Sequence, residues 1–280
     1  MTPLRKATIT AMEQRGFSPR TRESYLYAVQ KLAAYYHRSP DRLGPQELRD
    51  FITYLATERK LAPASCRLYF NGLMFLYREV LHWPQLELGI VLPKRPQRIP
   101  ELLTRAEVAA LISACANPKH RSMLCCAYGC GLRLGERIGL RVRDIDGERQ
   151  LLRIEQGKGA KDRLVRLSPA LLAELRAHWR RYRPDHWLFP GQRPGVHLCE
   201  TSIQKAYGAA KAGAGIAKRG GIHSLRHAYA SHQLAAGMPV TELQRQLGHS
   251  HVSSTLRYLH WLPEYHEHSA GTDLLAELPA

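Results

Sequence analysis

The feature that most constrains this chain is a proline-spaced segment at residues 84–103. Its four prolines prevent a continuous helix, because proline lacks an N–H and its ring clashes with the preceding turn. Helix-like apolar spacing lies on both sides of this segment. We therefore interpret residues 85–102 as an interdomain linker, and its basic residues as contacts for an anionic backbone: Lys94, Arg95 and Arg98.

Residues 1–84 predict a compact module of four helices. Ser18 and Pro19 form a typical helix start, with an N-cap residue followed by proline at the first helical position. Apolar residues then recur every three or four positions, as in an amphipathic helix. Several basic residues fall near expected helix ends, where they could reach phosphates: Arg20, Arg22, Lys60 and Arg67.

Residues 103–280 predict a mostly helical domain with a small antiparallel β-sheet. Thr104 and Glu107 have the spacing of a capping box, and a further helix is expected over residues 118–130. Strands expected at 151–155 and 163–167 would pair as a β-hairpin around a glycine–lysine–glycine turn. The expected fold class is therefore mainly α.

The charge of the chain indicates its partner. Forty-one Lys and Arg residues against 24 Asp and Glu give a net charge of +17, which favours a polyanion. An acidic membrane surface would also suit this charge, but we find no basic amphipathic helix, lipidation signal or long apolar run. The N-terminus lacks the apolar core of a secretory signal, and the six cysteines include no C-x-x-C pair. We expect a cytoplasmic, nucleic-acid-binding protein with free thiols.

Four short motifs contain the residues that could catalyse a reaction or bind an anion. GLRLGE contains Arg133 and Glu136, GKGAKDR contains Lys158, Lys161 and Arg163, HSLR contains His223 and Arg226, and LGHSHVSSTLRYLH contains His249 and Tyr258. Each motif alone is common: His223 could be a packed polar residue and Arg226 a solvated charge. A histidine and an arginine three positions apart at a helix start can also hold an anion together. The combination in a basic chain favours a phosphate site.

With these motifs the chain resembles the tyrosine recombinase, or phage integrase, family, including the Xer-type recombinases. The resemblance covers nearly the whole chain, with residues 1–84 similar to the core-binding domain and 103–280 to the catalytic domain. It implies two phosphate-clamping arginines, a hairpin lysine, two histidines, a tyrosine nucleophile and a supporting acid: Arg133, Arg226, Lys158, His223, His249, Tyr258 and Glu136. We also expect Lys161 and Arg163, in the same basic motif as Lys158, to contact DNA.

The resemblance implies a reaction in which Tyr258 attacks a DNA phosphodiester and forms a 3′-phosphotyrosine. His223 would accept the phenolic proton, and Lys158 would protonate the departing 5′-oxygen. Because two arginines can hold the non-bridging oxygens, we expect no metal, ATP or other cofactor. The expected partners are double-stranded DNA, four protomers on two sites and, in some systems, accessory DNA-binding proteins; DNA-bound protein would be nucleoid-associated in a bacterium.

The remaining histidines, His227 among them, are assigned to packing, the surface or the DNA backbone. Arg137 departs from the family pattern, because an apolar residue is usual at its position. Two other functions stay open: a type IB topoisomerase, which the short chain and helical module disfavour, and an inactive DNA-binding protein, which the full catalytic set disfavours. Residues 272–278 predict a short apolar helix that packs on its own domain or is passed to a neighbouring protomer.

Overall fold

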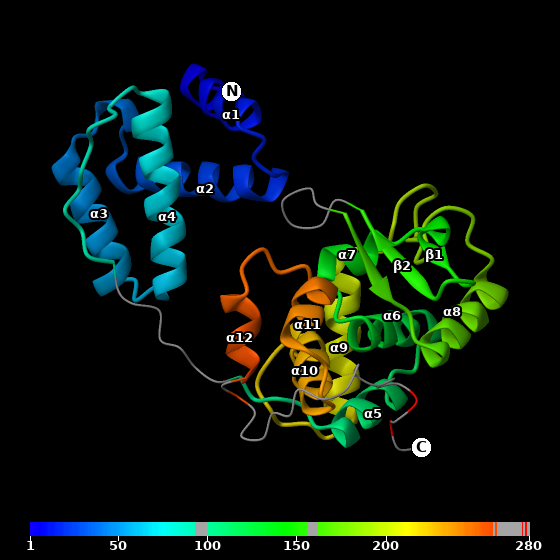
Figure 1. Ribbon diagram of the computed structural model, residues 1–280. Coiled ribbons are helices and arrows are strands. Elements are labelled where there is room, and N and C mark those ends of the chain that lie inside the picture. Colours follow the sequence, from blue (N-terminus) through cyan, green and yellow to red (C-terminus); the bar gives the residue numbers. More distant parts are fainter. Residues whose placement is uncertain (93–99, 156–161, 260, 262–275, 277, 279–280) are drawn as a thin grey trace. The chain divides into compact units, whose positions relative to one another are not determined.

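The computed structural model describes residues 1–92, 100–155, 162–259, 261, 276 and 278. The chain divides into two units, Met1–Arg98 and Ile99–Ala280 (Figure 1). Both are built mainly of helices, and the second also contains a small antiparallel sheet, so the expected fold class is confirmed. Within the described ranges, none of the helices combines the length and apolar character that crossing a bilayer requires.

The first unit consists of the four expected helices. Each begins with proline at its first position, where the missing N–H would have had no intrahelical partner. Ser18 caps the second helix by accepting a hydrogen bond from the Thr21 N–H at 3.2 Å. The helices are α1 (Pro3–Gln14), α2 (Pro19–Tyr36), α3 (Pro45–Thr57) and α4 (Pro63–Phe75), with a 3₁₀ turn at Pro40–Arg42 and a π-helical continuation of α4 at Leu76–Val80.

Apolar residues of α2, α3 and α4 form the core of the first unit, including Leu32, Phe51 and Leu73. Leu86 and Leu88 join this core and are only 7% and 3% exposed. The beginning of the segment that we expected to be a linker therefore packs as part of the first unit, because its leucines complete an apolar cluster. The basic positions Lys94, Arg95 and Arg98 lie outside the described residues.

The second unit combines helices with a three-stranded antiparallel sheet in the order β1-β2-β3. The expected hairpin is confirmed, and its pair Leu152 and Val165 is fully buried. A two-residue strand, β1, adds to the hairpin and was not expected. The elements are α5 (Arg105–Ser113), α6 (Pro118–Gly129), α7 (Leu134–Ile138), a 3₁₀ turn at Val142–Asp144, β1 (Ile145–Asp146), β2 (Leu151–Ile154), β3 (Arg163–Arg166), α8 (Pro169–Tyr182), α9 (Glu200–Gly213), α10 (His223–Ala235), α11 (Val240–Leu247) and α12 (Ser253–Leu259).

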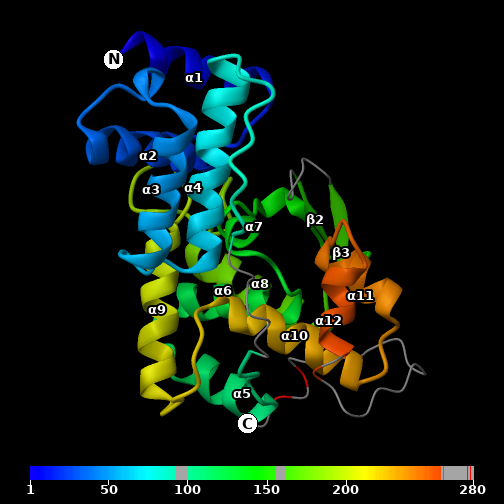
Figure 2. The same ribbon diagram turned by 90° about the vertical axis from the view of Figure 1, so that its left-hand side faces the viewer.

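Helix α10 is the centre of the second unit. It packs against α5, α6, α11 and α12, and α11 in turn contacts β3 (Figures 1 and 2). Nine of its 13 residues are buried. Because other elements surround it, side chains at its start and on its α12 side are held in fixed positions.

Gly131 makes a close packing contact possible where α6 turns into α7. Its φ of +59° is left-handed, a conformation that a side chain disfavours. A Cβ atom at this position would lie 2.4 Å from Cδ1 of Tyr229 and 2.9 Å from Cδ2 of Leu247. The turn can therefore rest on α10 and α11 only while residue 131 has no side chain.

We predict that Gly131→Ala lowers the free energy of unfolding by about 2 kcal/mol or more, because left-handed strain and steric overlap add together. Urea unfolding of the full chain would measure the change. Gly135→Ala in α7 is a matched control, because its Cβ would meet nothing within 4 Å. It should raise stability by about 0.5–1 kcal/mol, since alanine suits a helix better than glycine. Equal stability of the two variants would contradict the packing argument.

Candidate active site

Four segments far apart in the sequence converge beside α10. Arg133 is the N-cap residue of α7, and Arg163 begins β3. His223 and Arg226 lie in the first turn of α10. His249 follows α11, and Tyr258 lies in α12. The structure thus brings together the described members of the expected catalytic set.

The carboxylate of Glu136 is shared by two guanidinium groups. Arg163 donates from Nη1 and Nη2 to its two oxygens, each at 2.8 Å, and Arg133 Nη1 donates at 2.8 Å. The Arg133 backbone N–H also donates to Glu136 at 2.8 Å. Burial alone would raise the pKa of Glu136, but hydrogen bonds and charge from Arg163 and Arg133 lower it to about 2. Glu136 is therefore ionised at neutral pH and holds both arginines.

Arg163 has a different position from the one we expected. Its side chain is only 10% exposed, and its Nε donates to the Gln246 carbonyl at 3.0 Å. Left-handed Gly248 makes room for it, because a Cβ there would lie 2.8 Å from Arg163 Cδ. The expectation that Arg163 contacts DNA is therefore revised: its guanidinium is engaged inside the domain.

Arg226 is almost fully buried and is held by backbone carbonyls. Its Nη1 donates to the Gly131 carbonyl at 2.7 Å, and its Nη2 donates to the Leu247 carbonyl at 2.8 Å. Arg133 is held in a similar way, because its Nη2 donates to the Gly248 carbonyl at 2.8 Å. Burial, reinforced by the charge of Arg133, lowers the pKa of Arg226 to about 10, so the group keeps its charge at neutral pH.

His249 connects Arg226 to α12. Its Nε2 lies 3.0 Å from Arg226 Nη2, which can only donate, so Nε2 is the acceptor. Nδ1 must then carry the proton, which it donates to Thr255 Oγ1 at 2.8 Å. Burial and the neighbouring arginine charges lower the pKa of His249 to about 3, which keeps the ring neutral. Thr255 is fully buried and was not foreseen from the sequence.

Tyr258 is 4% exposed, and its hydroxyl lies 3.0 Å from Nδ1 of His227. Its ring lies parallel to that of His249, with the centroids 6.4 Å apart. The rings of His227 and His223 also meet, at a centroid distance of 4.8 Å. Sequence reasoning missed His227, although its position four residues after His223 places both on one face of α10. The histidine that contacts the tyrosine is therefore His227, with His223 beside it.

Both of these histidines are neutral at physiological pH. Burial, followed by the positive charge of neighbouring groups, lowers the pKa of His223 and of His227 to about 4. Burial raises the pKa of Tyr258, and the charges of Arg226, Arg257 and Arg133 oppose that rise. The phenol is therefore protonated and faces a neutral imidazole that can accept its proton.

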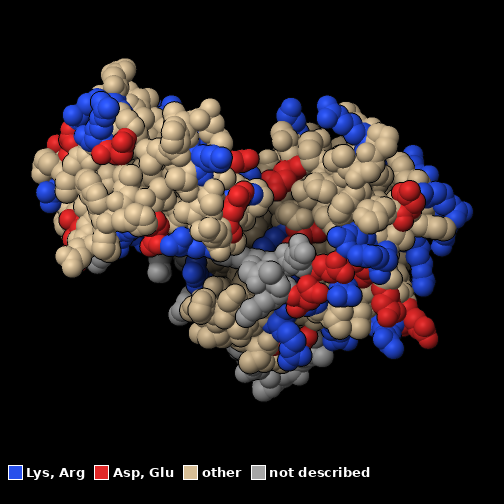
Figure 3. Space-filling model, turned by 90° about the horizontal axis from the view of Figure 1, so that it is seen from above, with Lys and Arg blue, Asp and Glu red and all other residues tan. Residues whose placement is uncertain are grey.

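The other expected contacts are distributed between described and undescribed residues. Lys158 and Lys161 lie outside the described residues. In the first unit, Arg20, Lys60 and Arg67 are exposed, whereas Arg22 forms an ion pair with Glu13. Figure 3 shows lysine and arginine side chains over the visible face, with many along its right-hand edge. Among the described residues, no three His, Cys, Asp or Glu side chains form a group that could hold a metal ion.

Comparison with known proteins covers both units. Residues 101–264 match the model of the Phage integrase family, and residues 4–85 match that of the phage integrase N-terminal SAM-like domain. A Sinorhizobium fredii protein named as an integrase/recombinase is 41% identical over 261 residues, which cover 92% of this chain and 84% of that protein. An integrase/recombinase of Escherichia coli is 32% identical, covering 88% of this chain and 86% of its own.

Two solved structures share the fold at low sequence identity. XerH site-specific recombinase bound to its difH substrate matches with a TM-score of 0.72 and 18% identity, covering 92% of this chain and 82% of that one. A lambda integrase dimer bound to a core site matches with a TM-score of 0.72 and 17% identity, covering 90% and 95%. The arrangement of helices described above is therefore one that solved proteins of this kind also adopt.

The neutral histidines predict a loss of stability in mild acid. An unfolded histidine has a pKa of about 6.5, whereas His223 and His227 titrate at about 4 and His249 at about 3 in the folded protein. Below about pH 6.5 the unfolded state binds more protons, so the free energy of unfolding falls as the pH decreases towards 4. Above that window the stabilisation is complete.

Urea unfolding at several pH values would measure this dependence. The His227→Gln variant lacks a titrating group at this position. Between pH 6.5 and 4, its free energy of unfolding should therefore depend less steeply on pH, by up to the contribution of about one bound proton. His251→Gln, at an exposed position, is the matched control for the loss of an imidazole. A wild-type stability that does not change across this window would show that these histidines are not held neutral.

Proposed function

Because this chain belongs to the phage integrase family, we propose that it is a site-specific DNA recombinase that works through a 3′-phosphotyrosine intermediate. The observation that carries the proposal is the buried hydroxyl of Tyr258, bonded to neutral His227 in a cluster that also contains Arg133 and Arg226. This grouping supports the proposal, because it places a phenol beside a proton acceptor and two cationic groups that could hold a phosphate. The names of the relatives, which are integrases and recombinases, agree with this reaction.

The scissile phosphate would bind between the two guanidinium groups. Arg226 is fixed by the carbonyls of Gly131 and Leu247, so it needs little rearrangement before it meets the phosphate. Arg133 is fixed by Glu136 and by the Gly248 carbonyl. Fixed donors aimed at developing charge stabilise a transition state more than mobile ones do. The negative charge on the non-bridging oxygens would thus meet positive groups that are already in place.

The tyrosine oxygen would attack the phosphorus atom while the bond from phosphorus to the 5′-oxygen breaks. The phenolic proton would pass to Nδ1 of His227, with His223 beside it as a second imidazole. The family resemblance had implied His223 for this step. The departing 5′-oxygen would take a proton from Lys158, whose assignment rests on the family motif. The reverse attack by a 5′-hydroxyl would then reseal the strand and free Tyr258.

Neither a metal ion nor ATP has a place in this proposal, because the arginines carry the charge and the phosphotyrosine conserves the energy of the phosphodiester.

Four chains acting on two duplex sites would complete an exchange. Residues 271–275, in the tail that could link neighbouring chains, lie outside the described residues. Light scattering of the complex with two-site DNA would count the chains. If exchange required a cell extract, accessory proteins would also take part.

Tyr258→Phe tests the nucleophile directly. The substitution removes one oxygen and little surface, so binding to double-stranded DNA should change by less than about twofold while covalent attachment disappears. Denaturing electrophoresis of a reaction with nicked substrate, in which the cleaved fragment diffuses away, would detect the adduct. An adduct that persists in the variant would remove Tyr258 from this role.

The same assay separates the other parts of the proposal. Wild-type cleavage should continue in EDTA and without ATP. A substrate with sulfur at the bridging 5′ position should restore cleavage by Lys158→Ala, because a thiolate leaves without needing a proton.

Strand exchange between two sites distinguishes a recombinase from a topoisomerase, which would only relax supercoiled DNA. Binding without any adduct in the wild type would instead indicate an inactive DNA-binding protein.

A further inference from the structure

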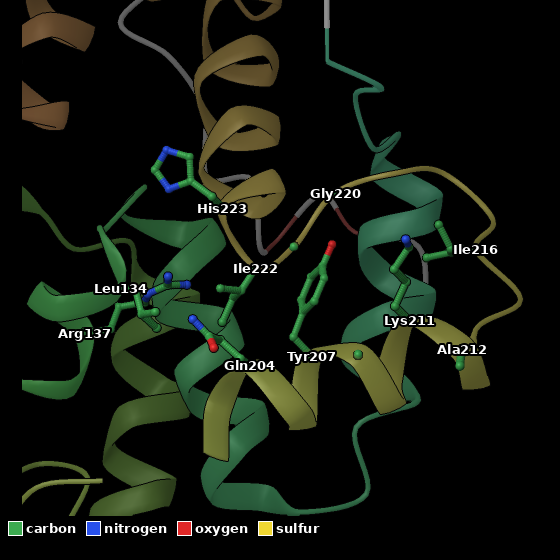
Figure 4. Close-up of a pocket in the computed structure, with 12 residues that line it drawn as sticks. Leu134, Arg137, Gln204, Tyr207, Lys211, Ala212, Ile216, Gly220, Ile222 and His223 are labelled. Carbon is green, nitrogen blue, oxygen red and sulfur yellow. The ribbon is translucent and has the colours of Figure 1, made fainter. Parts of the chain in front are cut away.

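A cavity of about 760 Å³ lies between α7, α9 and the start of α10. Figure 4 shows Gln204, Tyr207 and Lys211 on successive turns of α9, with Arg137 approaching from α7 and His223 at the top. Its lining includes the cationic side chains of Arg137 and Lys211 and, within the part of the chain that the structure describes, no acidic side chain. His223 belongs both to this cavity and to the cluster around Tyr258, so the cavity adjoins the proposed catalytic site.

Arg137 is the unusual residue of the cavity. It is 0% exposed, and its Nη1 and Nη2 have no hydrogen-bond partner among the described residues. Only Nε is engaged, through a 3.3 Å hydrogen bond to the Arg133 carbonyl. Burying a charge without a partner is strongly unfavourable. A guanidinium at a position where an apolar residue would pack well therefore needs a compensating anion.

The protein itself does not supply that anion among its described residues. Burial lowers the pKa of Arg137 to about 10, so the group is still charged at neutral pH. Glu136 is the acidic neighbour, but its two oxygens are already bonded by Arg133 and Arg163. Cys126, the other neighbour whose charge could help, is a neutral thiol because burial raises its pKa well above the usual value. Among the described residues, the Glu136 carboxylate therefore binds two guanidiniums, those of Arg133 and Arg163, and has no oxygen left for Arg137.

We propose that the cavity binds a phosphate group, that Arg137 is its main ligand, and that this phosphate belongs to the DNA strand beside the scissile phosphate. The assignment of this phosphate to DNA rests on the proposed function. A DNA strand held by Arg133 and Arg226 would pass close to His223, which also lines the cavity. The positive end of α10 adds to the attraction, since the helix begins at the cavity edge. Lys211 and the amide of Gln204 complete a set of groups that can donate to phosphate oxygens.

Arg137→Met separates a ligand from a structural residue, because methionine keeps much of the length but removes the charge. Without ligand, the variant should have a melting temperature equal to or above that of the wild type, since no unpaired charge is buried. Inorganic phosphate, compared with chloride at equal ionic strength, should raise the melting temperature of the wild type and not of the variant. A variant that melts lower than the wild type and responds equally to phosphate would overturn the proposal.

The DNA arm tests the source of the phosphate. Both proteins would carry Tyr258→Phe to prevent cleavage, and affinity for a duplex bearing the cleavage site would be measured at several salt concentrations. Loss of one phosphate contact should reduce the slope of log affinity against log salt by about 0.9. A methylphosphonate placed beside the cleavage position should lower the DNA affinity of the protein that has Arg137 and should not change the DNA affinity of the Arg137→Met protein. Arg180→Met, which removes an exposed charge on α8, should not abolish this position-specific response.

Equal salt slopes and equal methylphosphonate responses with and without Arg137 would overturn DNA as the source. If the inorganic phosphate arm still depended on Arg137, the site would be one for free phosphate instead. Neither arm requires cleavage. A wild type that forms no covalent adduct would therefore refute the proposed function. The phosphate and DNA-binding measurements with and without Arg137 would still test the phosphate site.

Discussion

The second unit depends on one buried interaction, the Glu136 carboxylate held between the guanidiniums of Arg133 and Arg163. These hydrogen bonds connect the start of α7 to β3, and Arg163 continues the connection to the end of α11 through the Gln246 carbonyl. Without the carboxylate, two arginines would face each other in a poorly solvated space. With it, the Arg133 guanidinium is held in one orientation.

The rest of the site follows from an excess of positive charge in a buried environment. Arg226 is fixed by carbonyls, and burial near these cations keeps His223, His227 and His249 neutral. A neutral imidazole can accept the proton of Tyr258, whereas a charged one could not. In the proposed reaction, the positive charge that would attract the phosphate would also keep the base neutral, so binding and proton transfer would share one physical cause.

Local rules predicted much of the fold. Proline after a capping residue marked helix starts such as Ser18-Pro19, and two short apolar segments around a glycine–lysine–glycine turn predicted the hairpin, whereas its register, with Leu152 opposite Val165, came from the structure. Leu86 and Leu88 escaped prediction because their burial depends on a core built from distant helices. The motif order identified the candidates Arg133, Glu136, Arg226, His249 and Tyr258 by family resemblance. Arg163, His227 and Thr255 could not be assigned in that way, since their partners are 27, 31 and 6 residues away and are chosen by tertiary packing.

The most direct test of this account is single-turnover cleavage by Glu136→Gln, measured beside its affinity for the same DNA. Glutamine keeps the size of the side chain but cannot balance two guanidiniums, so Arg133 and Arg163 should lose their orientation. We predict that cleavage falls on the order of 100-fold, as for the loss of a fixed transition-state donor, while DNA affinity changes only a few-fold. Cleavage at the wild-type rate would contradict the claim that this carboxylate organises the site.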